Sequence, residues 1–223
     1  MKVFIVIPAY NERRTIRQVV EAVLQQYSQV VVVDDGSTDG TYEQLAGLGA
    51  CRLRHMLNRG QGASLQTGIE YALAQGAEII VTYDADGQHC VQDIATLIEP
   101  ICQGEAEVVL GSRFLGSAEN IPWHRRGMLR IAVYLTRYLS GLRLSDTHNG
   151  LRALSRTAAE RIHLTMDRMA HASEILDIIG REQLHYVERP VTISYTTHSL
   201  QKGQSTWDAI RLFVKLLEAK VLQ

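Results

Sequence analysis

Short runs of β-branched residues alternate with longer stretches that have one apolar face, and this alternation limits the possible folds most strongly. The apolar run over residues 3–7 predicts a buried strand that ends at Pro8, and the all-valine run over residues 30–33 predicts a second one. The segment between them carries apolar residues at helical spacing, namely Ile16, Val19, Val20, Val23 and Leu24. A strand–helix–strand order gives a mostly parallel central sheet with helices on both faces. The expected fold class is therefore α/β.

The same alternation continues along the chain. We expect further strands over residues 52–55, 78–83, 108–111 and 152–154, and a last strand over 186–195 that is broken at Pro190. We expect further helices over residues 63–74, 91–102, 128–139, 171–180 and 207–222. No linker, repeat or low-complexity tract interrupts the sequence, which favours one domain over residues 1–223.

The composition excludes several classes of protein. The net charge is −1, from 23 basic and 24 acidic residues, which argues against a protein that wraps nucleic acid through phosphate contacts. The three cysteines (Cys51, Cys90 and Cys102) form no CxxC pair, so neither a disulfide framework nor a zinc site is indicated. The N-terminal apolar run is too short for an export signal, and no run reaches the length that crosses a bilayer. We expect a cytoplasmic protein that does not itself span a membrane.

Polar clusters follow three of the predicted strands, over residues 8–12, 34–41 and 84–89. In open α/β sheets ligands bind beyond the carboxyl ends of the strands. Two acidic clusters at one edge would repel each other unless a cation or hydrogen-bond donors lie between them. A divalent metal that holds a diphosphate meets this need, because Mg²⁺ and Mn²⁺ prefer carboxylate and phosphate oxygens. The alternative is that the Asp-Gly-rich segments are only turns.

Three common ligand-binding motifs are absent. An EF-hand over residues 35–46 fails because Ala46 stands where a bidentate glutamate is required. The glycine-rich segment 60–65 lacks the third glycine of a dinucleotide fingerprint, and the sequence contains no P-loop motif.

Five motifs stand in order along the chain: IPAYNE (7–12), VDDGSTDGT (33–41), NRGQGA (58–63), DADGQH (84–89) and GSR (111–113). Together they resemble the family 2 glycosyltransferases of the GT-A fold, most closely the dolichol- or polyprenyl-phosphate mannosyltransferase-like branch. The segments DTHNGLR (146–152) and ERPV (188–191) also look like that branch, so the resemblance covers nearly the whole chain. It implies a GT-A fold with a nucleotide-sugar half over about 1–113 and an acceptor half over about 114–223.

The resemblance also implies which residues bind the donor. The nucleotide-sugar would contact Pro8, Tyr10, Glu12, Val33, Asp35, Gly62, Asp84, Ala85 and Lys202. Asp86 would ligate Mg²⁺ or Mn²⁺ directly, with Gln88 as a further metal or phosphate contact and Asp84 at the ribose or acting through water. Asp35 would read the base, but a carboxylate accepts hydrogen bonds from either uracil or guanine and does not choose between them.

The implied catalytic residues are Asp86, Asp84 and Arg113. A phosphate acceptor is already anionic and needs cations rather than a general base, and Arg113, Arg125 and Arg126 are the candidates. The alternative for Arg125 and Arg126 is a solvated charge pair. A sugar-hydroxyl acceptor would need a base. The candidates for that base are His148, His171 and Glu174, and His89 and His198 also lie near motif residues.

The C-terminal part departs from the resembled branch. Residues 199–206 lack the arginine that typically precedes a Gly-Lys-Ser-Lys segment there, although Lys202 and Ser205 remain. This departure suggests a relative that acts in bacterial envelope-polysaccharide synthesis. The helix expected over 207–222 either packs on the domain or docks to a membrane or a small membrane-embedded partner. The expected location is cytoplasmic, peripheral at the inner face of the membrane.

The leading hypothesis is a metal-dependent, inverting glycosyltransferase. It would move a sugar from a nucleotide-diphosphate sugar to a polyprenyl phosphate or another cell-envelope acceptor, either a lipid phosphate or a glycan. One alternative is a sugar-nucleotide pyrophosphorylase-like nucleotidyltransferase, which needs a glycine-rich loop where this chain has residues 8–10. Another alternative is a non-catalytic nucleotide-sugar-binding subunit, against which Asp84 and Asp86 argue.

Overall fold

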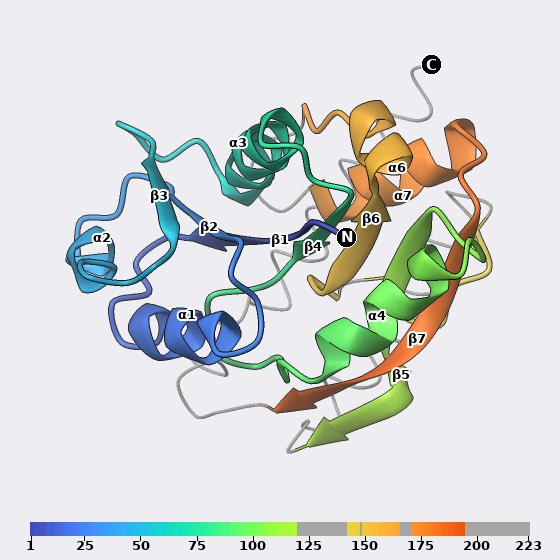
Figure 1. The fold of residues 1–223 in the computed structure, drawn as a ribbon, viewed down its shortest axis with the longest axis horizontal. Coiled ribbons are helices and arrows are strands. Elements are labelled where there is room, and N and C mark those ends of the chain that lie inside the picture. Colours follow the sequence, from blue (N-terminus) through green and yellow to red (C-terminus); the bar gives the residue numbers. More distant parts are fainter. Residues whose placement is uncertain (120–141, 148, 166–170, 195–223) are drawn as a thin grey trace, which may run out of the picture.

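A computed structural model describes residues 1–119, 142–147, 149–165 and 171–194. Its centre is a seven-stranded sheet of order β3-β2-β1-β4-β6-β5-β7 (Figure 1). The strands are β1 (Val3–Ala9), β2 (Val30–Asp34), β3 (Cys51–Arg54), β4 (Ile79–Thr82), β5 (Val108–Glu119), β6 (Arg152–Ser155) and β7 (Tyr186–Ser194). Only β6 runs antiparallel to its neighbours β4 and β5, while every other pair is parallel. The expected mostly parallel sheet is confirmed.

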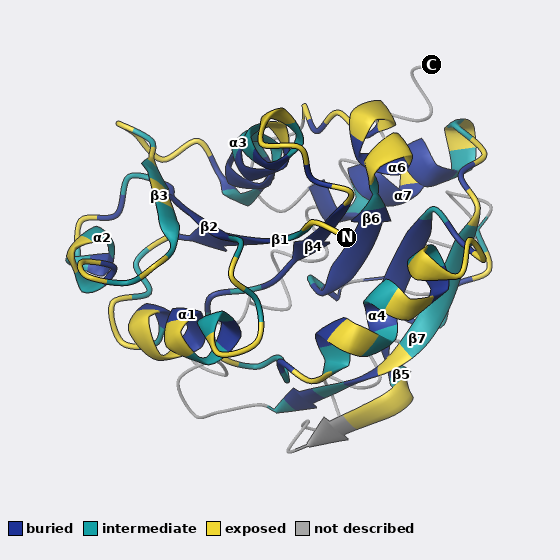
Figure 2. Ribbon diagram, viewed as in Figure 1, coloured by how far each residue is buried: buried dark blue, intermediate teal, exposed yellow. Residues whose placement is uncertain are grey.

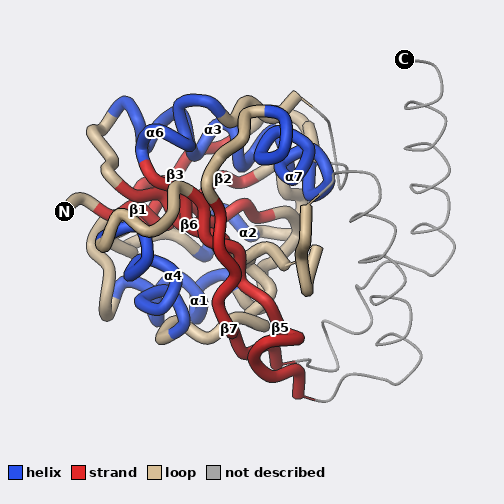
Figure 3. The backbone as a smooth tube through the Cα atoms, turned by 90° about the vertical axis from the view of Figure 1, so that its right-hand side faces the viewer, coloured by secondary structure: helices blue, strands red, loops and turns tan. Residues whose placement is uncertain are grey.

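Helices cover both faces of the sheet, as the sequence predicts (Figure 3). One face carries α1 (Ile16–Leu24) and α4 (Asp93–Cys102), and the other carries α3 (Gln61–Ala74), α6 (Arg156–Arg161) and α7 (His171–Arg181). A short helix, α2 (Thr41–Gln44), follows β2. Successive strand residues point to opposite faces. Ile5 and Ile7 therefore join the core with α1 and α4, while Val6 joins the core with α3 and α7. The central strands β1, β2 and β4 and the inner sides of the helices are largely buried, whereas β3 and β7 at the two ends of the sheet are partly exposed (Figure 2).

The structure differs from the sequence prediction at β7. The strand continues through Pro190, which is paired in register with Ser112, so the expected break there is wrong. Among the described residues, β7 is the last strand of the sheet and pairs with one neighbouring strand, and an edge strand tolerates a proline, which has no N–H. The partner strand β5 is longer than expected because its pairing with β7 resumes at Ser117 after a register shift. Helix α6 was not anticipated, and the expected helices over 128–139 and 207–222 lie outside the described residues.

The topology brings distant parts of the sequence to one edge of the sheet. β1, β2 and β4 are parallel neighbours that end at Ala9, Asp34 and Thr82, and we call this side the carboxyl edge. Because β6 runs the other way, it begins at the carboxyl edge, and its first residue, Arg152, is paired with Thr82. Helices α3 and α7 also begin at this edge, since each runs back toward the start of a parallel strand.

Candidate active site at the carboxyl edge of the sheet

Hydrogen bonds join the loops that follow β1 and β2. The backbone N–H of Asn11 donates to Ser37 Oγ at 2.9 Å, and that of Glu12 donates to Thr41 Oγ1 at 2.8 Å. The Asn11 side-chain oxygen in turn accepts from the Thr38 backbone at 3.0 Å. These bonds form one polar surface from the two motifs for which a nucleotide-binding role is predicted.

Asp35 is held by three donors from the segment before α3. Its carboxylate accepts from His55 Nδ1 at 2.8 Å and from the backbone N–H groups of Arg59 at 2.9 Å and Gly60 at 2.7 Å. The second ring nitrogen of His55 lies 3.0 Å from Thr67 Oγ1 of α3, so the ring is fixed on both sides. Asp35 is only 2% exposed. Its carboxylate is therefore a preoriented acceptor at the carboxyl edge.

Two acidic residues of the 34–41 segment have local structural contacts. Asp34 is buried, and its carboxylate pairs with Arg54 Nε at 3.1 Å. Asp39 accepts from the Thr41 backbone at 2.9 Å at the start of α2. Partial burial opposes ionisation of Asp39, but hydrogen bonds from Thr41 and Arg13 outweigh it and lower its pKa. Asp34 and Asp39 therefore fit the interpretation as residues that stabilise a turn. Asp35 is the acidic residue of this segment that contacts the NRGQGA motif over residues 58–63.

Asp84 follows β4 and is joined to Asp35 through α3. Its Oδ1 accepts from Gln61 Nε2 at 3.0 Å, and the preceding residue, Gly60, donates to Asp35. Its Oδ2 lies 3.0 Å from His89 Nε2, and the side chain is 27% exposed. Burial opposes ionisation, but the His89 hydrogen bond and nearby positive charge outweigh it and lower the pKa of Asp84. Hydrogen-bond donors thus lie between the two acidic clusters, as their juxtaposition requires.

Asp86 has the opposite electrostatic character. Its carboxylate accepts from the Gln88 backbone at 3.0 Å and from Gln88 Nε2 at 2.6 Å. Burial and the negative charges of Asp84 and Glu12 raise the pKa of Asp86 to about 6, although His89 and Gln88 act the other way. Negative charge thus exceeds positive charge around this carboxylate, which is the environment that favours a cation.

A divalent metal fits the donor set around Asp86 only in part. Asp86 offers carboxylate oxygens, which suit Mg²⁺ or Mn²⁺, and the Gln88 side chain lies beside it with its amide nitrogen toward Asp86 Oδ2. Within residues 1–119, 142–147, 149–165 and 171–194, no group of three or more His, Cys, Asp or Glu side chains could enclose an ion. Ions of this kind are commonly held by one or two carboxylates together with substrate phosphates. The site fits a metal that binds together with its substrate.

The residues after position 110 contribute further buried charged and titratable side chains, of which Arg152 and His171 act electrostatically on Asp84. Arg113 is 8% exposed, and its Nε donates to Asp146 Oδ2 at 2.6 Å. His171 begins α7 and is buried, and Glu174 accepts from the Thr165 backbone at 2.8 Å. Arg152 is 4% exposed at the start of β6. Burial lowers the pKa of Arg152 to about 10, against the opposing effect of Asp84 and Asp146.

The remaining predicted site residues fall into two groups. Tyr10 is 46% exposed at the carboxyl edge, whereas Pro8, Val33 and Ala85 are buried. Gly62 is buried in the first turn of α3. Arg125, Arg126, His148, His198 and Lys202 lie outside the described residues.

Sequence reasoning missed His55, Gln61 and Arg152. Gln61 lies inside the NRGQGA motif and Arg152 inside the DTHNGLR motif, while His55 is the last residue of the strand predicted over 52–55. These positions in the sequence could have marked the three residues as members of the site. The aspartates that His55 and Gln61 contact are 20 or more residues away in sequence, and no local pattern reveals such contacts.

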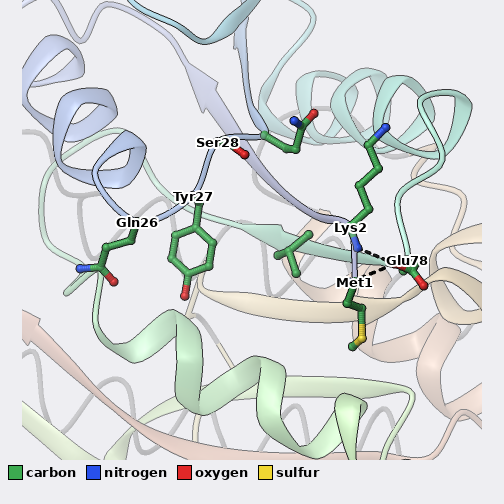
Figure 4. A pocket seen from close by; sticks show the side chains of 8 residues that line it. Met1, Lys2, Gln26, Tyr27, Ser28 and Glu78 are labelled. Atoms are coloured by element: carbon green, nitrogen blue, oxygen red, sulfur yellow. Dashed lines mark hydrogen bonds and ion pairs between the residues drawn. The ribbon is translucent and has the colours of Figure 1, made fainter.

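A separate pocket opens at the opposite edge of the sheet (Figure 4). It is lined by Met1, Lys2, Val3, Gln26, Tyr27, Ser28, Gln29 and Glu78. These residues precede or begin β1, β2 and β4, so the pocket lies at the far ends of the strands that carry the acidic residues. It contains none of the predicted site residues.

A mostly parallel sheet with acidic motifs that converge at its carboxyl edge agrees with the GT-A fold of glycosyltransferases. The sequence model of "Glycosyl transferase family 2" matches residues 4–162, and the chain belongs to this family. Among its relatives is the UDP-N-acetylglucosamine–dolichyl-phosphate N-acetylglucosaminyltransferase of Methanococcus voltae, which is 33% identical over 98% of this chain and 96% of its own length. The polyprenol monophosphomannose synthase of Mycolicibacterium smegmatis is 32% identical over 86% of this chain and 77% of its own length. The chain is a glycosyltransferase.

A solved structure supports the fold assignment. Glucosyl-3-phosphoglycerate synthase from Mycobacterium tuberculosis, determined with Mn²⁺, UDP-glucose and phosphoglyceric acid, superposes with a TM-score of 0.70. The match covers 97% of this chain and 77% of that one at 17% identity. None of the helices within the described residues is both long and apolar enough to cross a membrane.

Proposed function

We propose that this glycosyltransferase moves a sugar from a nucleotide-diphosphate sugar to a polyprenyl phosphate, with a divalent metal and with inversion at the anomeric carbon. The observation that carries the proposal is the convergence of three motifs at the carboxyl edge. The Gly60–Gln61 step contacts both Asp35 and Asp84, and Asp86 follows two residues later. The relatives named for dolichyl-phosphate and polyprenol transfer support the choice of acceptor.

On the donor side, the nucleotide would lie along the joined β1 and β2 loops. Asp35 would accept an N–H of the base, for which it is already preoriented by His55 and by the 59–60 backbone. Asp84, fixed by Gln61 and His89, would hold the ribose or a water. Tyr10, Glu12 and Lys202 complete the proposed donor set.

Asp86 and Gln88 would hold Mg²⁺ or Mn²⁺ beside the diphosphate. When bound, the metal would neutralise the negative charge that forms on the nucleotide diphosphate as the anomeric C–O bond breaks. The acceptor phosphate oxygen would form the new bond from the opposite face of the sugar, which inverts its configuration. That oxygen is already anionic, so no proton has to be removed, and Arg113 with Arg125 and Arg126 would hold it.

The proposed acceptor implies a position at the membrane. We infer a cytoplasmic protein that associates peripherally with the inner face, with a small membrane-embedded partner or the 207–222 segment as the link. Full transfer to polyprenyl phosphate in detergent, with no partner added, would contradict the need for a partner.

The test is nucleotide release from a panel of UDP- and GDP-sugars, with Mg²⁺ or Mn²⁺ and with or without polyprenyl phosphate. We expect one donor class to react, and only when both metal and lipid phosphate are present. Asp86→Asn should abolish release, whereas Asp39→Asn should not, because Asp39 accepts from the Thr41 backbone away from the site and Asn keeps a side-chain oxygen for this bond. The absence of release with every donor would overturn the proposal.

A further inference from the structure

Arg152 is a buried cation that forms no hydrogen bond or ion pair through its side chain within the part of the chain that the structure describes. It lies between Thr82 of β4 and Leu110 of β5, and it shares a sheet face with Leu154, which packs in the core of α3 and α7. The residue is 4% exposed. Its side chain makes no hydrogen bond and no ion pair with any residue in the described ranges, whereas the neighbouring Arg113 is bound to Asp146.

A charge in this position requires an explanation. Buried charged groups in proteins are normally paired and hydrogen-bonded, since desolvation without a partner is costly. Asp84 and Asp146 act on Arg152 through space and favour its charged form, but neither forms an ion pair with it. The guanidinium remains protonated at neutral pH, because its pKa stays near 10. Among the described residues, its five N–H donors have no side-chain or backbone acceptor.

The surroundings of Arg152 favour an anion. The side-chain nitrogen of Asn149, three residues earlier, is also buried without an acceptor among the described residues. Gly150 packs against the Asp84 carboxylate, which brings this segment to the donor side of the site. Helices α3 and α7 both begin at the same edge, and the N-terminus of a helix attracts negative charge.

We propose that Arg152 binds a phosphate group of the substrate through its planar pair of N–H groups, with Asn149 as a second donor. A guanidinium matches two phosphate oxygens at once, which a lysine ammonium does not. The inference deepens the proposed function and depends on it. The phosphate comes either from the donor diphosphate or from the lipid acceptor, and both present the same chemistry.

The test compares Arg152→Lys and Arg152→Gln with the unchanged protein. Arg156→Lys is the matched control, because Arg156 is exposed and pairs only with Glu160 and a backbone carbonyl. Calorimetry would measure the binding of UDP and GDP with Mn²⁺ in one arm and of a short-chain polyprenyl phosphate in the other. We expect both Arg152 variants to lose at least about tenfold in affinity in one arm, with lysine giving no rescue.

Thermal unfolding of the ligand-free variants provides the second measurement. If Arg152 serves to bind an anion of the substrate, Arg152→Gln should keep or raise the melting temperature of the ligand-free protein, because it removes a buried charge that has no partner among the described residues. Unchanged affinity in both arms, or full rescue by Arg152→Lys, would overturn the inference and leave the proposed function intact. If the unchanged protein bound no nucleotide and no lipid phosphate, the proposed function itself would fail.

Discussion

At the scale of single residues, the position of the Asp84 carboxylate depends on Gly150, which lies in the segment before β6. A Cβ atom built on Gly150 would lie 2.1 Å from Asp84 Oδ2, far inside van der Waals contact. The same segment is fixed by Thr82, whose hydroxyl donates to the Gly150 carbonyl at 2.6 Å. The carboxylate is thus confined by Gly150 on one side and by Gln61 and His89 on the others.

Gly150→Ala should therefore displace the Asp84 carboxylate and reduce sugar transfer. We expect kcat to fall at least about tenfold, which corresponds to roughly 1.4 kcal/mol of transition-state stabilisation. Gly49→Ala is the control, because a Cβ there meets nothing within 4 Å. The measurement is nucleotide release under saturating donor and acceptor. Equal rates for the two variants would show that the position of Asp84 does not limit the reaction.

At the scale of elements, α3 approaches β1 closely through Gly68. A Cβ on Gly68 would lie 2.3 Å from Val6 Cγ1, and both residues are buried. This approach sets the depth at which α3 lies on the sheet. It thereby helps to place Gly60 and Gln61, at the start of the same helix, against Asp35 and Asp84.

Gly68→Ala should destabilise the fold by about 1–3 kcal/mol through overpacking, and the better helix propensity of alanine should offset part of this. Adding Val6→Ala removes the atom in conflict, so the double variant should be more stable than the sum of the two single changes predicts. Urea denaturation of the four proteins in this cycle measures the coupling. Additive free energies of unfolding would mean that α3 shifts freely on the sheet.

The same elements show what local sequence patterns can predict. The strands at β1, β2 and β4 were predictable because fully buried parallel strands are continuous apolar runs. The continuation of β7 through Pro190 was not, because it depends on β7 being an edge strand, which is a property of the whole sheet. Helix α6 has only six residues, too few for a hydrophobic period to be recognised.

At the scale of the whole molecule, topology determines which motifs meet. The rule that ligands bind at the carboxyl ends of parallel strands predicted correctly that the 34–41 and 84–89 clusters share one edge. The reversed strand β6 then brings Arg152 to that edge, and this could not be read from residues 146–152 alone. Sequence spacing therefore predicts the proposed donor side better than the proposed acceptor side, because the motifs proposed for the donor follow consecutive parallel strands.

The way in which the site is assembled predicts that a divalent metal and a nucleotide stabilise the protein against unfolding only when both are present. Asp86 and Gln88 offer few ligands, and the described residues contain no cluster that encloses an ion, so the metal should depend on the diphosphate for its remaining oxygens. Mn²⁺ alone should then raise the melting temperature little. Mn²⁺ with the correct nucleoside diphosphate at about 100 times its Kd should stabilise by about 2.7 kcal/mol, or roughly 5–10 °C for a chain of this size.

Chelation, or Asp86→Asn, should remove this increase in melting temperature, whereas Asp39→Asn should keep it. Equal stabilisation by Mn²⁺ with and without nucleotide would mean that the protein encloses the metal by itself.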